Sequence, residues 1–158
     1  MSNSNAEARR SARLAAVQAL YQMEISGAGS LEVAEEFAAY RFAELPVAPD
    51  AEFFNAIVDG VPRHQMEIDR AIAGSLSQNW RLERVDSILR AILRCGVFEL
   101  VARRDVPAKV AIDEYVALAG AFFGGDEPGF INGALDTIAR RKRSAEFGLP
   151  TPEGELDF

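Results

Sequence analysis

Hydrophobic residues recur along most of the chain at intervals of three and four positions, the spacing that places them on one face of an α-helix. In the first such run, Leu14, Val17 and Tyr21 follow this spacing, and Gly27-Ala28-Gly29 supplies the glycines that commonly end a helix. No segment shows the alternation of a strand, and no internal repeat is evident. The pattern predicts six helices, beginning near residues 8, 30, 50, 85, 107 and 126.

The third predicted helix contains a proline. Asp50 is a suitable N-cap for it, and Pro62 falls inside its apolar pattern, which resumes between Met66 and Leu76. Proline has no N–H to donate and clashes with the preceding turn. We therefore expect a kink or a split near Gly60.

The fourth predicted helix is the most hydrophobic, with apolar residues on more than one stripe between Val85 and Leu100. Such a helix belongs at the centre of the core. Gly96 lies in its interior, where glycine costs about 1 kcal/mol relative to alanine, so we expect another helix to approach closely there. Pro107 suits the first turn of the fifth helix, whose apolar positions are Val110, Tyr115, Val116, Leu118, Ala119 and Phe122. In the sixth, they are Ile131, Ala134, Leu135 and Ile138.

A chain of 158 residues is long enough for one domain, or for two small subdomains that share a core. The polar run 75–79 is expected to link two such subdomains. We predict an all-α fold with a flexible N-terminal arm at 1–7, one helical domain at 8–143 (subdomains about 8–78 and 79–143) and an acidic mobile tail at 144–158.

Charge is distributed unevenly. The net charge of −7 and the pI near 4.8 argue against a general nucleic-acid binder. Positive charge is nevertheless gathered at 9–13 and 140–143, towards the two ends of an acidic body. Arginines at a helix N-terminus oppose the helix dipole. Either they form a solvated helix end, or they attract phosphate together with the free N–H groups of the first turn.

Signatures of catalysis are nearly absent. His64 is the single histidine, no phosphate-binding glycine loop occurs, and adjacent acids such as Asp113 and Glu114 point away from each other on a helix. Cys95 is the single cysteine and lies in an apolar run, which favours a buried structural thiol. We predict no catalytic residue, no metal site and no cofactor.

The apolar runs are too short to span a membrane, and the polar N-terminus lacks the apolar core of a signal peptide. The single cysteine allows no disulfide within the chain, which suits a reducing compartment. These features predict a cytoplasmic protein without a membrane association.

The sequence contains better candidates for RNA-binding residues than for catalytic ones. Arg10, Arg13, Gln18 and Tyr21 lie within a few turns of one helix. Arginine contacts phosphate, glutamine reads a base edge and tyrosine stacks on a base, although Tyr21 also fits a place in the core. Further along, Phe130 lies one position off the apolar face of the last helix, beside Asp126, and Lys109 begins the helix before it. For each cation the alternative is a solvated side chain.

These residues form part of a wider resemblance. The chain resembles the NusB family of bacterial transcription antitermination factors over roughly residues 8–141. The matching segments are Arg9–Arg13 with Ala16–Tyr21, Ile92–Arg94 with Phe98–Leu100, Val106–Glu114, and Phe130–Asp136.

The resemblance implies two small helical bundles packed together. It also implies binding to the single-stranded boxA sequence of nascent ribosomal or phage transcripts, a heterodimer with the ribosomal protein NusE, and entry into an antitermination complex on RNA polymerase. By position, the RNA-binding residues are Arg9, Arg10, Arg13, Gln18, Tyr21, Lys109, Asp126, Phe130 and Asn132.

Ser11 departs from the pattern, since some members have another arginine there and the basic segment is weaker here. An acidic body with few arginines should bind RNA weakly alone, so we expect the partner to be needed. Its surface is expected around the fourth helix, at Glu83 and Arg90. The free protein is expected to be a monomer or a weak homodimer. The alternative function is a homo-oligomeric helical scaffold without RNA specificity. An enzyme fragment is a poorer alternative because no glycine-rich cofactor loop is present.

Overall fold

The computed structural model describes residues 2–76 and 81–150, which form helices and no strand. The predicted all-α fold class is therefore confirmed. The α-helices are α1 (Ser2–Ser26), α2 (Ser30–Glu36), α3 (Ala51–Arg63), α4 (Gln65–Ser75), α5 (Ser87–Ala102), α6 (Ala108–Phe122) and α7 (Glu127–Lys142). Shorter elements are the π-helix η1 (Phe37–Arg41) and the 3-10 helices η2 (Phe42–Glu44), η3 (Leu82–Arg84) and η4 (Ser144–Phe147).

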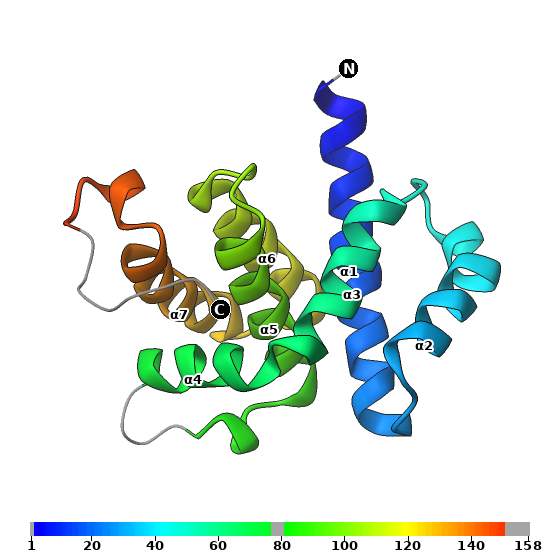
Figure 1. The fold of residues 1–158 in the computed structure, drawn as a ribbon, viewed down its shortest axis with the longest axis horizontal. Coiled ribbons are helices and arrows are strands. Elements are labelled where there is room, and N and C mark those ends of the chain that lie inside the picture. Colours follow the sequence, from blue (N-terminus) through cyan, green and yellow to red (C-terminus); the bar gives the residue numbers. More distant parts are fainter. Residues whose placement is uncertain (1, 77–80, 151–158) are drawn as a thin grey trace. The chain divides into compact units, whose positions relative to one another are not determined.

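Contacts between elements divide the chain into two compact units, Met1–Arg63 and His64–Phe158. In the first unit α1 lies along α3, and α2 packs against both (Figure 1). Aromatic rings fill part of its core. Phe37 stacks on Phe54 with ring centroids 5.6 Å apart, and Phe42 meets the same ring edge-on at 4.9 Å.

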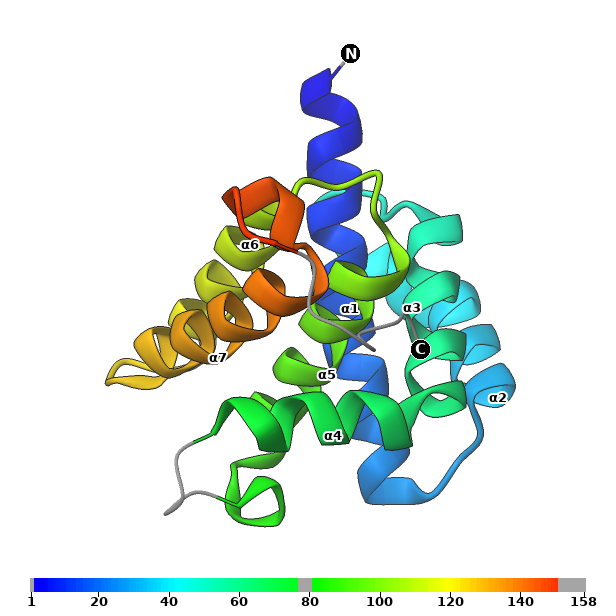
Figure 2. The same ribbon diagram turned by 60° about the vertical axis from the view of Figure 1, so that its left-hand side comes forward.

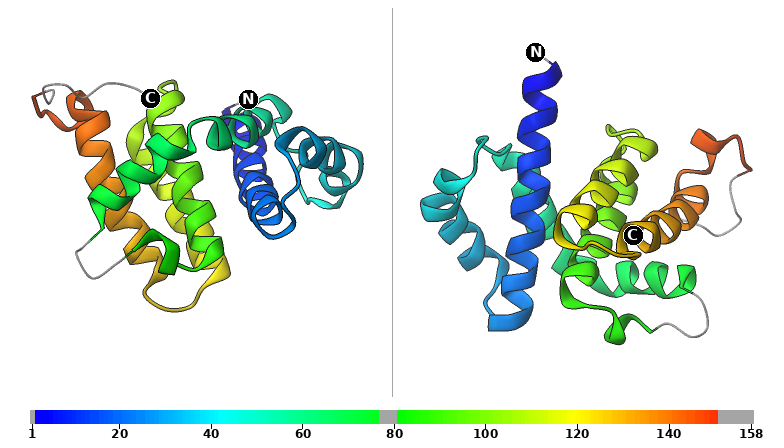
Figure 3. Two further views of the ribbon diagram at one scale, coloured as in Figure 1. Left: turned by 60° about the horizontal axis from the view of Figure 1, so that its bottom comes forward. Right: turned by 180° about the vertical axis from the view of Figure 1, so that it is seen from behind.

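The first helix is longer than predicted and buries a different face. It begins at Ser2 rather than at Ala8, so the segment predicted as a flexible arm is helical (Figure 3, right). Tyr21, predicted on the apolar stripe, is 38% exposed, and Ile25, one turn further on, is 65% exposed. The buried apolar positions are Ala12, Ala15, Ala16, Val17, Ala19 and Leu20. Small alanines let neighbouring backbones approach closely, which a count of large apolar residues does not reveal.

The end of α1 agrees with prediction. Gly27 has a φ of +76° and donates its N–H to the Met23 carbonyl at 2.8 Å. This left-handed conformation costs glycine little and stops the helix. Ser30, which would suit the N-cap of the next helix by residue type, is instead its first residue, and Gly29 occupies the N-cap position.

The second predicted helix, which begins near residue 30, is in fact three consecutive helical segments that end at Glu44. After α2 the chain widens into the π-helix η1, in which the Phe42 N–H donates to the Phe37 carbonyl. A π-turn takes in one residue more than an α-turn. This change of phase brings both Phe37 and Phe42 against Phe54, which an unbroken α-helix would not allow.

The expected break at Pro62 occurs, but later than predicted. Asp50 caps α3 as predicted, since its Oδ1 accepts from the Phe53 N–H at 3.0 Å. The helix continues through Pro62 to Arg63, and α4 begins after His64. Proline removes one donor from the last turn, so the helix ends there rather than at Gly60.

The division into units follows this break rather than the predicted boundary between residues 78 and 79. Helix α4 belongs to the second unit. There, Arg94 of α5 donates to both carboxylate oxygens of Asp69 at 2.9 and 3.1 Å. This two-point ion pair fixes α4 on α5. Most of the predicted polar linker, residues 77–79, lies outside the described residues.

The central helix of the second unit is α5, which contacts α4, α6 and α7 (Figure 2). It begins at Ser87, capped by Asp86, whose Oδ1 accepts from the Ile88 N–H at 2.8 Å. The close approach expected at Gly96 is confirmed. A Cβ there would lie 2.8 Å from Cδ1 of Leu135 on α7.

Helices α6 and α7 lie side by side as an antiparallel pair (Figure 2). The predicted inward positions of α7 are buried, but two of those of α6 are wrong. Val110 is 46% exposed and Phe122 is 38% exposed. The buried face of α6 is formed instead by Ala108, Ala111, Ile112, Tyr115, Leu118 and Ala119. Pro107 is the N-cap residue, just before the helix rather than in its first turn.

A buried hydrogen bond joins α5 to α6. Glu99 is fully buried, and the Tyr115 hydroxyl donates to its Oε1 at 2.8 Å. One turn away, Cys95 is also buried, as predicted. Burial, with the nearby Glu99 carboxylate, raises the pKa of the Cys95 thiol well above its ordinary value. The thiol is therefore a core side chain without thiolate character.

The segment after α7 is part of the fold. Arg143 is buried and donates to the carbonyls of Leu100 at 3.1 Å and Val106 at 2.7 Å. It also pairs with Glu146 of η4, whose Oε1 accepts from the Ala108 N–H at 2.9 Å and so caps α6. The mobile tail predicted to begin at 144 is therefore wrong for 144–147, while 151–158 lie outside the described residues.

Candidate nucleic-acid interface

The basic segment 9–13 lies in the interior of α1, about two turns after the helix begins, and it packs around one aromatic ring. The guanidinium groups of Arg9 and Arg13 lie over the buried Phe53 ring, at 4.6 and 5.1 Å from its centroid. The Arg9 Nε is also 3.8 Å from Oδ2 of Asp50, the residue that caps α3. These contacts hold two of the three arginines in place and join α1 to the beginning of α3.

The three predicted arginines differ in how much they expose. Arg13 is only 3% exposed, Arg9 is half-buried and Arg10 is exposed. Burial leaves Arg13 with little surface for phosphate, whereas Arg10 is exposed to solvent. The structure thus separates three residues that sequence reasoning treated as equivalent.

Ser11, noted as a departure from the basic pattern, has a structural contact. Its hydroxyl donates to the Val47 carbonyl at 2.7 Å, and the Asp50 N–H donates to the Ala8 carbonyl at 3.0 Å. The loop before α3 is therefore tied to the start of α1. An arginine at position 11 would lose the first of these hydrogen bonds.

Of the remaining α1 candidates, Tyr21 points in nearly the same direction as Arg10, and Gln18 lies about 80° round the helix from it. Tyr21 is 38% exposed and Gln18 is half-buried. At 100° per residue, Arg10 and Tyr21 differ in direction by only about 20° and lie about 16 Å apart along the axis. We call Arg10, Gln18 and Tyr21 the α1 stripe. It presents a cation, an amide and an aromatic ring along one side of a helix.

The candidates of the second unit are not all together. Asp126 is exposed and Phe130 is half-buried, one turn apart at the start of α7. Asn132 is exposed, but two residues beyond Phe130 it points to another side of the helix. Lys109 is exposed at the start of α6, about 20 Å along the helix pair from the α6–α7 turn. Only Asp126 and Phe130 form a compact pair.

The basic run at 140–143 is less available than its sequence suggests. Arg143 is buried, and Arg140 pairs with Asp136 at 2.9 Å while lying over the Phe147 ring at 4.8 Å. Sequence reasoning counted these charges but missed their partners. The later acids and Phe147 were assigned to a tail, so nothing in the pattern indicated that they return to α7.

The two residues predicted for a protein partner lie at the entry to α5. Glu83 is exposed in η3. The Arg90 guanidinium donates to the carbonyls of Val85 and Glu83 and to the Ser87 hydroxyl at 3.0 Å. Arg90 therefore holds the η3–α5 junction, and Glu83 is the more available of the two.

Two kinds of site are not found in the described part of the chain. Residues 2–76 and 81–150 contain no group of three His, Cys, Asp or Glu side chains placed to hold a metal ion. Among the helices of the same residues, none is long and apolar enough to cross a bilayer.

Comparison with known proteins gives one consistent match. The NusB family model matches residues 10–140. The transcription antitermination protein NusB of Maricaulis maris (strain MCS10) is 52% identical over 151 residues, covering 92% of this chain and 94% of the relative.

Solved structures agree with this match. T. maritima NusB superimposes with a TM-score of 0.75 at 29% identity, covering 89% of this chain and 97% of that structure. A crystal structure of the antitermination factors NusB and NusE in complex with double-stranded RNA gives 0.72 at 27% identity, covering 85% and 97%.

Proposed function

The chain belongs to the NusB family, and we propose that it is a bacterial transcription antitermination factor. In this role it binds boxA-type RNA of nascent ribosomal RNA transcripts together with the ribosomal protein NusE, and joins an antitermination complex on RNA polymerase. The role is one of binding, with no chemical step, and its place is the cytoplasm. The similarity to NusB proteins over nearly the whole chain supports this proposal.

The observation on this molecule that carries the proposal is the α1 stripe. Its three side chains suit the parts of a single-stranded RNA: Arg10 a phosphate, Gln18 a base edge and Tyr21 an unstacked base. Arg9 adds a second, half-buried cation beside them. We assign Arg13 a supporting part, since its guanidinium lies over the Phe53 ring.

The start of α7 supplies a second contact in this proposal. Phe130 offers a ring for stacking, and the Asp126 carboxylate accepts a hydrogen bond from a base amino group. A carboxylate repels phosphate, so Asp126 favours selection of a base over general affinity. Lys109 and Asn132 remain proposed contacts of lesser weight, because neither lies beside this pair.

The test is a titration of the protein onto fluorescent RNA with and without a NusE-type protein, at two salt concentrations. Three RNAs are compared: a single strand of boxA type, its scrambled sequence, and the boxA strand in a duplex. The proposal expects partner-enhanced, salt-sensitive binding that favours the boxA single strand over the scrambled one. Equal affinity for boxA and scrambled RNA with the partner present would overturn it, and preference for the duplex would overturn the single-strand assignment.

The scaffold alternative makes the opposite prediction in the same experiment. A homo-oligomer without RNA specificity shows a large mass by light scattering and no shift of any RNA. The proposed factor is a monomer or a weak homodimer when free.

A further inference from the structure

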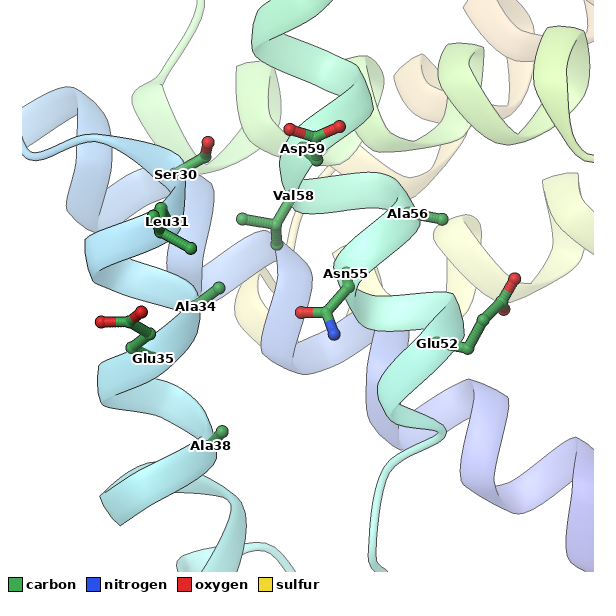
Figure 4. Close-up of a pocket in the computed structure, with 10 residues that line it drawn as sticks. All are labelled: Ser30, Leu31, Ala34, Glu35, Ala38, Glu52, Asn55, Ala56, Val58 and Asp59. Atoms are coloured by element: carbon green, nitrogen blue, oxygen red, sulfur yellow. The ribbon is translucent and has the colours of Figure 1, made fainter.

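A groove between α2 and α3 takes no part in the proposed RNA binding. Its volume is about 650 Å³, and all its lining residues belong to the first unit. The two helices run in opposite directions along it, so that Ser30 lies near Asp59 at one end (Figure 4). Along α2 and the following π-helix it extends from Ser30 to Ala38, about 12 Å or two helical turns.

The groove has an apolar lining of small side chains. Ala34, Ala38, Ala56 and Val58 contribute to it, and Figure 4 shows Val58 on the side of α3 that faces α2. Leu31, on the same lining, is 73% exposed. Small residues allow another backbone to approach closely, and an exposed leucine gains from being covered.

The charge around the groove is mainly negative. Residues 30–59 contain seven carboxylates and one arginine, a net charge of −6 in a chain whose total is −7. Three of these carboxylates, on Glu35, Glu52 and Asp59, belong to lining residues. Asp59 forms an ion pair with Arg63 at 3.0 Å, and Glu35 is exposed on α2. Such a surface repels nucleic acid and attracts a cationic partner.

The π-helix η1 beside the groove also indicates a binding surface. Ala38 lies within the π-helix η1, and such turns occur frequently at functional sites. Tyr40, in the same element, is 71% exposed. Exposed tyrosines are typical of surfaces that bind proteins.

We propose that this groove binds an amphipathic helix of a partner protein, with small or aliphatic residues on one face and lysine or arginine at its edges. The apolar face covers Leu31 and the alanines, and the cations meet Glu35, Glu52 and Asp59. Two helical turns match the length of the groove. This surface is separate from the α1 stripe, so the same molecule can hold RNA and this partner.

The test uses the full chain and a fluorescein-labelled model peptide of about four helical turns, with leucine and alanine on one face and lysine on the other. A peptide with glutamate in place of lysine is the matched control. Fluorescence anisotropy gives the affinity, and amide chemical shifts locate the contact. We expect the lysine peptide to bind, with shifts concentrated at 30–41 and 52–59, and the glutamate peptide not to bind.

Three variants separate groove binding from general attraction to an acidic protein. Glu35→Lys reverses a charge at the groove, and Ala38→Trp fills it without changing charge. Each is expected to weaken binding about tenfold. Asp113→Lys, at an exposed position of α6, is the control: it makes the same charge change away from the groove and is expected to weaken binding less than about twofold. Melting curves check that each variant is folded.

Several results would overturn the proposal. They are shifts that map elsewhere, equal effects of Glu35→Lys and Asp113→Lys, or no effect of Ala38→Trp. Displacement of the peptide by boxA-type RNA would assign the groove to RNA. Sedimentation showing a dimer that Glu35→Lys abolishes would assign it to a second copy of the chain. Failure of RNA binding alone leaves this proposal standing.

Discussion

The guanidinium of Arg13 lies 5.1 Å from the centre of the Phe53 ring, with Arg13 only 3% exposed. The guanidinium of Arg9 lies over the same ring, 4.6 Å from its centre. A helical segment that resembles a row of phosphate-binding cations in the sequence is therefore also a packing site. Arg13 therefore serves mainly the fold, whereas Arg10 lies at an exposed position.

This division of roles predicts different effects on stability. Arg13→Ala removes a buried side chain and a cation–π contact, so it should lower the free energy of unfolding by about 1–3 kcal/mol. Arg10→Ala, at an exposed position, should change it by less than about 0.5 kcal/mol. Urea unfolding measures both, and equal effects of the two substitutions would contradict the assignment.

Gly96 and Gly74 form a matched pair of helix glycines. Gly96→Ala places a Cβ 2.8 Å from the buried Leu135 side chain, whereas nothing lies within 4 Å of a Cβ at Gly74. Overpacking should outweigh the gain in helix propensity, so Gly96→Ala is expected to destabilise by about 1 kcal/mol. Gly74→Ala should stabilise by about 0.5–1 kcal/mol. Thermal melting compares them, and stabilisation by both would show that the close helix contact does not constrain residue 96.

The buried hydrogen bond between Tyr115 and Glu99 gives a third prediction. Tyr115→Phe removes the hydroxyl that donates to a fully buried carboxylate, and should cost about 1–3 kcal/mol of stability. Tyr40→Phe is the control, because Tyr40 is 71% exposed and should tolerate the change. Chemical denaturation of both variants measures the difference. A Tyr115→Phe variant as stable as the parent would mean that this bond contributes nothing net.

Ionisation of Glu146 makes the stability that the C-terminal segment contributes depend on pH. Burial by itself would raise its pKa, but the Ala108 N–H and the Arg143 guanidinium outweigh burial and lower the pKa below its ordinary value. A lowered folded-state pKa stabilises the protein above the unfolded-state pKa, near 4.5, and this contribution is lost as pH falls through the folded-state value.

The expected effect is small because the Glu146 side chain is 39% exposed. Glu146→Gln should cost about 1 kcal/mol or less at pH 7, after allowance for solvent screening. The difference from the parent should shrink steadily below about pH 4.5. Unfolding free energies measured from pH 7 to pH 3 test this, and a difference that stays constant with pH would speak against the carboxylate as its source.

Much of the fold follows from spacing and punctuation in the sequence. The Asp50 cap, the glycine stop at Gly27 and the close contact at Gly96 are local rules that survive in the structure. The buried face of α1 does not follow, because it consists mainly of alanines that a hydrophobic count ranks low. The π-helix at Phe37–Arg41 depends on packing against Phe54, a residue distant in sequence.

The candidate site shows the same limit. Residue types predict which side chains suit RNA, but not that Arg13 is buried or that Arg143 holds two carbonyl groups. Lys109 and Phe130 appear close in a list of motifs and lie towards opposite ends of the α6–α7 pair. Tertiary contacts determine which of these side chains are buried and which lie together, and a local sequence pattern does not contain that information.

The most direct test of the RNA-binding account is the salt dependence of boxA-type RNA affinity, measured with the NusE-type protein present. Arg10→Ala is compared with Arg70→Ala, which removes an exposed arginine from α4. The account predicts that Arg10→Ala weakens binding about tenfold and lowers the slope of log affinity against log salt by about 0.7, the value for one phosphate contact to a single strand. Arg70→Ala should leave both unchanged. Identical affinity and slope for the two variants would contradict the assignment of the α1 stripe to RNA.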